Sequence, residues 1–136
     1  MIELIKLERD YAMIAGWWKA HEMPAPPREI LPEWGLLVSD GQTAIAATFV
    51  YRELTGRICF VEWTISNPLV PRHAVDVAVK EMLSFVLREA PRQGYPIVLT
   101  SVGEGSGLRH VCRRLGWKDC TGKPHRHMLT VSTGKN

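Results

Sequence analysis

Residues 57–117 have the sequence RICFVEWTISNPLVPRHAVDVAVKEMLSFVLREAPRQGYPIVLTSVGEGSGLRHVCRRLGW. The apolar run over 57–66 has the β-branched and aromatic composition of a strand. From 75 to 90, apolar residues recur every three to four positions, which predicts a helix with one buried face. A second strand is expected over 97–102 and a short helix over 106–115. Because a helix crosses between the two strands, we expect them to be parallel.

The chain before residue 57 predicts a further helix and three strands. These elements are a strand over 2–7, a helix that Asp10 caps and that runs to about His21, and strands over 34–39 and 43–52. Asp40-Gly41 is a strong hairpin signal between the last two strands. With the strand over 57–66, these two form an antiparallel meander, and alternation over 127–132 predicts a final strand.

The sum of these elements is an α/β (α+β) fold. We expect a mixed, mostly antiparallel sheet of six or seven strands, with a central parallel pair and helices on both faces. The 136 residues fit a single domain. No apolar run approaches the length of a membrane span, the net charge is a mild +3, and the three cysteines lack the spacing of a disulfide framework. These features predict a cytoplasmic protein with no membrane partner.

The order of elements in 57–117 resembles the acyl-CoA-binding half of the GNAT superfamily of N-acetyltransferases. The resemblance implies an acceptor-side half over 1–56, an acyl-CoA-side half over 57–136, and acetyl-CoA as the acyl donor to an amine. In that family an Arg/Gln-x-x-Gly-x-Gly/Ala turn wraps the CoA pyrophosphate. Arg72 matches its first position here, but Val75 and Val77 stand where small residues are expected. Since a β-branched side chain obstructs close approach to a phosphate, the loop is degenerate.

The resemblance also implies which residues meet the acyl donor. The expected pyrophosphate contacts are Arg72, His73, Ala74 and Val75, and the expected pantetheine contacts are Thr64, Ile65 and Ser66. Arg72 and His73 are cationic or can become so, and they can compensate in part for the missing glycines.

Glu62 is the first candidate for chemistry, because it interrupts an apolar strand beside the expected cleft. Members of the family with a general base often use a Glu on this strand, and partial burial would raise its pKa toward the working range. An outward-facing or ion-paired Glu62 is the alternative. Cys112 stands where many members carry a Tyr that protonates the leaving thiolate, and Ser101 is a second candidate for that role. Buried cysteines more often pack inertly.

The resemblance places Trp17, Trp18, His21 and Trp34 at the acceptor site. An aromatic wall with one imidazole can hold a flat or cationic acceptor. Adjacent tryptophans on a helix point about 100° apart, so we expect one of Trp17 and Trp18 in the core and the other in the pocket. The sequence does not tell which.

Other interpretations of the sequence stay open. A catalytically inactive protein of the same fold that binds a host or viral macromolecule would explain the valines in the phosphate turn. The basic residues of the C-terminal third suit a CoA 3′-phosphate, a nucleic-acid backbone or a solvated helix face, but no nucleic-acid-binding motif accompanies them. They are Arg109, Arg113, Arg114, Lys118, Lys123 and Arg126.

Three further features of the sequence bear, more weakly, on a metal site, on the origin of the protein and on its oligomeric state. Cys120, His125 and His127 are of the types that bind zinc, but Cys-x4-His-x-His matches no common structural motif, so we expect no metal. The stretch Trp17–His21, followed by proline-rich sequence, is similar to small acetyltransferase-like proteins of tailed bacteriophages, which would place the protein in the host cytoplasm. An exposed edge of the C-terminal strand could pair two subunits in a homodimer.

Overall fold

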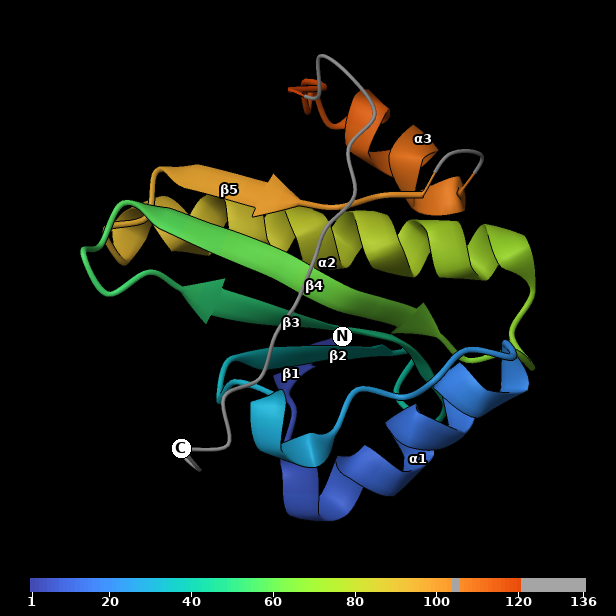
Figure 1. Ribbon diagram of the computed structural model, residues 1–136. Helices are drawn as coiled ribbons and strands as arrows, with labels where there is room; N and C mark the ends of the chain where they lie inside the picture. Colours follow the sequence, from blue (N-terminus) through green and yellow to red (C-terminus); the bar gives the residue numbers. More distant parts are fainter. Residues whose placement is uncertain (104–105, 121–136) are drawn as a thin grey trace.

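The computed structural model describes residues 1–103 and 106–120 (Figure 1). Its elements are β1 (Ile2–Leu4), α1 (Leu7–Ala20), the 3₁₀ turn η1 (Arg28–Ile30), β2 (Gly35–Ser39), β3 (Ala44–Arg52), β4 (Ile58–Ser66), α2 (Arg72–Arg92), β5 (Ile97–Thr100) and α3 (Gly107–Arg114). The mixed α/β fold predicted from the sequence is confirmed.

The described strands form one sheet in the order β1-β2-β3-β4-β5. Neighbouring strands are antiparallel except β4 and β5, which are parallel, as the crossing by α2 requires. The predicted parallel pair is therefore confirmed. Five strands are described where six or seven were expected, and the predicted strand over 127–132 lies outside the described residues.

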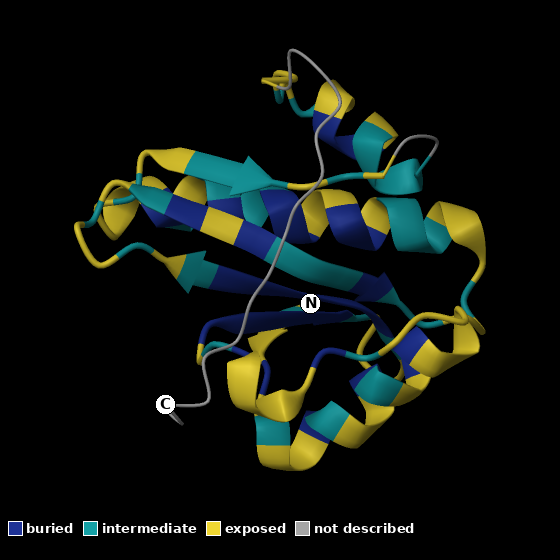
Figure 2. Ribbon diagram, viewed as in Figure 1, coloured by how far each residue is buried: buried dark blue, intermediate teal, exposed yellow. Residues whose placement is uncertain are grey.

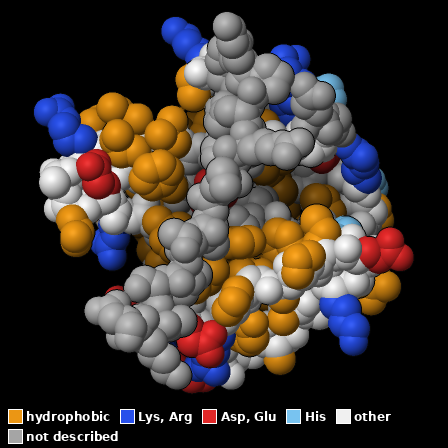
Figure 3. All heavy atoms as spheres, viewed as in Figure 1, with side chains coloured by type: hydrophobic (Ala, Val, Ile, Leu, Met, Phe, Trp, Pro, Cys, Tyr) orange, Lys and Arg blue, Asp and Glu red, His pale blue; other side chains and the backbone are white. Residues whose placement is uncertain are grey.

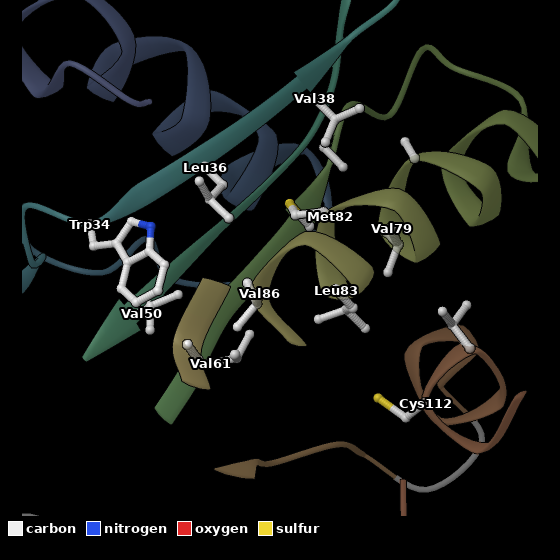
Figure 4. Close-up of a cluster of buried hydrophobic side chains, with 14 of the residues drawn as sticks. Trp34, Leu36, Val38, Val50, Val61, Val79, Met82, Leu83, Val86 and Cys112 are labelled. Atoms are coloured by element: carbon white, nitrogen blue, oxygen red, sulfur yellow. The ribbon is translucent and has the colours of Figure 1, made fainter. Parts of the chain in front are cut away.

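Helices cover both faces of the sheet, with α2 on one and α1 on the other (Figures 1 and 2). The core under α2 includes Leu36, Val38, Val50, Val61, Val79, Met82, Leu83 and Val86 (Figure 4). The core under α1 includes Ile14, Trp17, Trp18, Leu37, Phe49 and Ile65. Successive strand residues point to opposite faces, so each central strand contributes to both cores.

The first helix begins four residues earlier than predicted, with Lys6 in place of Asp10 at the cap position, and Asp10 lies inside it. The Asp10 carboxylate still satisfies an amide at the helix start, because its Oδ2 accepts from the backbone N–H of Lys6 at 2.9 Å. Arg9 Nε donates to Asp10 Oδ1 at 2.7 Å, and this hydrogen bond lowers the pKa of the buried Asp10. Asp10 thus stabilises the helix start from its first turn, not from the cap position.

Gly35 gives the sheet a testable packing constraint. A Cβ at this buried position would lie 2.8 Å from Phe49 Cε1 and 3.0 Å from Ile5 Cδ1. We expect Gly35→Ala to lower the free energy of unfolding by about 1–3 kcal/mol, because the Phe49 ring must move in a filled core. Gly16→Ala, where a Cβ meets nothing within 4 Å, should instead raise it by about 0.5–1 kcal/mol. Urea denaturation of both variants measures these changes in the free energy of unfolding. Equal changes in the two variants would contradict the packing constraint at Gly35.

Candidate functional site

The two parallel strands separate partway along β4. Their pairing runs from Ile58↔Ile97 to Val61↔Thr100, where Thr100 Oγ1 also donates to Val61 O at 2.7 Å. β5 ends there, whereas β4 continues for five residues to Ser66. In the described part of the chain, residues 62–66 therefore have a strand partner on one edge only. The other edge offers backbone hydrogen-bonding groups to a ligand.

A β-bulge lies on β4 at the same place. Phe49 pairs with Glu62 and Ala47 with Ile65, so two residues of β4, Trp63 and Thr64, stand opposite one residue of β3. Trp63 has φ +59°, a left-handed conformation that is unfavourable for a bulky side chain. A bulge bends its strand, so β4 changes direction where β5 ends.

Tertiary contacts hold Trp63 in this conformation. Its Nε1 donates to Tyr51 Oη at 2.8 Å, and Tyr51 Oη donates to Ile30 O at 2.9 Å. The Trp63 ring packs edge-to-face on Trp18 with 5.9 Å between centroids. These contacts come from β3, α1 and the turn before β2, so the bulge is fixed by residues distant in sequence.

A groove of about 460 Å³ opens beside the free edge of β4. Its walls are the end of β4, the first two turns of α2, the start of α3, and His21 with Met23 after α1. Its lining includes Thr64, Ile65, Ser66, Arg72, Val75, Asp76 and Gly107. The structure therefore brings together the predicted pantetheine residues and two of the four predicted pyrophosphate residues. His73 and Ala74 lie on the first turn of α2 but do not line the groove.

Arg72 is the exposed cation of this groove. Within the described residues, its guanidinium makes no hydrogen bond or ion pair. It extends across to α3, where its Nη2 would lie 2.8 Å from a Cβ on Gly107. At the start of α2, the backbone N–H groups of Ala74 and Val75 bond to Pro71 O, whereas those of Arg72 and His73 precede the first helical bond. A guanidinium and free N–H groups at one helix start suit a phosphate.

Glu62 lies where the strands part, one residue before the bulge. It follows Val61, the last residue of β4 that pairs with β5, and like its β3 partner Phe49 it points to the α1 face. Partial burial raises the pKa of Glu62, and a hydrogen bond from Ser101 opposes that rise. Ser101 directly follows β5, so the two side chains meet across the point of separation. Burial also raises the pKa of nearby Tyr51, and the charge of Glu62 adds to the effect.

Cys112 points away from the groove. It is buried in the core between α3 and α2, and Figure 4 shows its sulfur directed toward α2. Burial raises the pKa of the thiol. The residues of α3 that line the groove are instead Gly107, Leu108 and Val111. This placement favours packing over proton transfer.

The four predicted acceptor-site residues do not form one wall. Trp17 and Trp18 of α1 are both buried in the core between α1 and the sheet, and neither lines the groove, where the sequence placed one of them. Trp34 lies in the core on the opposite face, with the Arg52 guanidinium 5.8 Å from its ring centre. His21 does line the groove, and its Nε2 donates to Ser66 O at 3.0 Å. Trp63, which packs on Trp18, was not singled out from the sequence.

Several predictions fall outside the described residues, namely His125, His127, Lys123, Arg126 and the C-terminal edge strand. Across residues 1–103 and 106–120, no group of three or more His, Cys, Asp or Glu side chains is placed to hold a metal ion. None of the helices there is both long enough and apolar enough to cross a membrane.

Comparison with solved structures identifies the fold. A probable acetyltransferase superposes with a TM-score of 0.70 at 11% identity, over 97% of this chain and 98% of that one. An aminoglycoside acetyltransferase from an uncultured soil metagenomic sample, in complex with sisomicin, gives 0.65 at 9% identity, over 98% and 96%. An acetyltransferase of Trypanosoma brucei gives 0.60 at 13% identity, over 97% and 98%.

At the level of sequence, no protein-family model and no curated protein matches this chain. The likeness therefore concerns three-dimensional structure, and it extends over nearly the whole chain. The chain has the fold of the acetyltransferases.

Proposed function

We propose that this protein is an acyl-CoA-dependent N-acyltransferase that transfers an acetyl group from acetyl-CoA to an amine. One observation carries the proposal: the pairing of β4 with β5 ends at Val61↔Thr100, and beyond it a groove lies along Thr64–Ser66 of β4 and reaches Arg72, which has no ion-pair partner among the described residues. An extended amide-bearing chain can pair with such an edge as a strand would. The pantetheine arm of CoA has two amides and fits this mode, with Thr64, Ile65 and Ser66 as its neighbours.

At the phosphate end of the groove, the residues present favour binding of a phosphate by side chains over binding by the backbone. Val75 is half-buried and lines the groove where the family has a small residue. Its branched side chain keeps a phosphate away from the backbone of the first turn. Arg72 then supplies the main phosphate contact, with the free N–H groups of Arg72 and His73 behind it.

In this proposal Glu62 acts as the general base. Its carboxylate takes a proton from the acceptor amine, the amine nitrogen attacks the acetyl carbonyl carbon, and the carbon–sulfur bond breaks. The departing CoA thiolate takes a proton that Ser101 can relay from the protonated Glu62, because the two side chains interact at the point of strand separation. No covalent enzyme intermediate is needed, so positioning of donor and acceptor supplies much of the rate.

A non-catalytic binding protein of the same fold is the second candidate. Exposed apolar side chains at the phosphate end of the groove favour it, because Leu69 and Val77 are 90% and 67% exposed. Hydrophobic side chains also gather over the face shown in Figure 3, with Lys and Arg around its edge. Such surfaces often contact other proteins. The bacteriophage origin stays a prediction.

Calorimetric titration of the protein with acetyl-CoA separates the two candidates. The enzyme proposal predicts saturable binding in the micromolar range, followed by release of free CoA thiol when amines are screened as acceptors. Absence of both heat and thermal shift at millimolar acetyl-CoA would end the enzyme proposal. A search for a macromolecular partner by pull-down would then follow.

A further inference from the structure

The starts of α2 and α3 meet at a single close contact, between Arg72 and Gly107. A Cβ on Gly107 would lie 2.8 Å from Arg72 Nη2 and 3.6 Å from Arg72 Cζ. Real carbon atoms do not approach so closely, so the guanidinium occupies the space that a side chain at 107 would fill. Gly107 does not have a positive φ, and its backbone conformation is open to other residues. A larger residue at 107 would therefore displace the end of the flexible Arg72 side chain from its present place.

We propose that Gly107 is a positioning residue that lets the Arg72 guanidinium lie over the groove, where it binds the CoA phosphates. This inference rests on the proposed function. The phosphate turn has Val75 where the family has a glycine, and Gly107 lies on the opposite wall of the groove. In our proposal Gly107 compensates for the missing glycine. There it admits a cationic side chain instead of allowing the backbone to approach the phosphate.

The charges around this contact favour an anion. Arg72 is the first residue of α2 and Gly107 the first of α3, so two helix starts with partial positive charge adjoin the guanidinium. A cation at such ends is unfavourable unless an anion lies nearby. Asp76 is the acidic residue of the groove lining, and its Oδ1 would lie 3.9 Å from a Cβ on Gly107. Among the ion pairs of the described residues, none joins Asp76 to Arg72, so the guanidinium is available to a ligand.

The Gly107→Ala variant tests the proposal through CoA affinity, measured by calorimetry on the full chain. We expect affinity to fall about tenfold, as for loss of one hydrogen-bonded charged contact. The melting temperature should stay the same or rise, because the atoms displaced are the end of a flexible side chain and alanine suits a helix better than glycine. Gly103→Ala is the matched control, since a Cβ there meets nothing within 4 Å, and it should leave affinity unchanged.

A double-mutant cycle shows whether the effect passes through Arg72. In an Arg72→Ala background, we expect Gly107→Ala to cause no further loss of CoA affinity. An equal loss in both backgrounds, or unchanged affinity in the single variant, would overturn the role of Gly107 while leaving the proposed function intact. Failure of the wild-type chain to bind CoA would overturn both, so the two failures are distinguishable.

Discussion

Glu62→Gln is expected to lower kcat at least about a hundredfold, the usual minimum contribution of a general base, with little change in acetyl-CoA affinity. The glutamine keeps the size and position of the side chain but cannot accept the amine proton. The assay is thiol release with whichever amine the wild-type protein acetylates. A variant with wild-type kcat would show that Glu62 is not the base.

The pH dependence of the wild-type protein and of Glu62→Gln gives an independent check on the role of Glu62 as the base. Because burial raises the pKa of Glu62, the wild-type rate should fall as pH drops through that raised value, where the carboxylate becomes protonated. Glu62→Gln should lack this limb. The folded state also binds this proton more tightly than the unfolded state, so Glu62 lowers stability as pH rises through the raised pKa. The melting temperature of Glu62→Gln relative to wild type should therefore increase with pH.

Arg72→Glu should weaken acetyl-CoA binding at least about a hundredfold, because it removes a charge-assisted phosphate contact and adds repulsion. The carboxylate would face the phosphates from the start of α2. Arg113→Glu changes the net charge equally at an exposed site on α3 that does not line the groove, so it controls for long-range charge. Its affinity should stay within about threefold of wild type at physiological salt, where distant charges are screened. Equal losses in the two variants would contradict a specific role for Arg72.

The fold was predictable because the repeat of apolar residues differs clearly between its strands and helices. The helix between two apolar strands required a parallel pair, and the pair is present. The boundary errors are local. Asp10 was expected before the helix because Asp often caps, but it lies inside the first turn and accepts from the backbone N–H of Lys6, the residue at the cap position.

The candidate site was predictable for those residues whose role follows from their place at the end of a strand or the start of a helix. Thr64, Ser66 and Arg72 lie at a strand end and a helix start, and the fold brings them to one groove. The side of the sheet on which Trp34 lies was not predictable, because β2 after it is buried on both faces and shows no alternation.

Two features of the site depend on contacts that have no local signature. The left-handed conformation of Trp63 runs against the preference of a bulky residue, and it is held by Tyr51 and Trp18 from other elements. The role assigned to Gly107 depends on a side chain that reaches it from α2. The sequence around Gly107 carries no sign of this contact.

A crystal structure of the protein with CoA tests the central claim most directly. We predict that the pantetheine arm lies between β4 and the start of α3, with its amides bonded to the backbone of residues 62–66 and a phosphate on Arg72. CoA bound elsewhere, or a groove filled by protein side chains in the complex, would contradict the account.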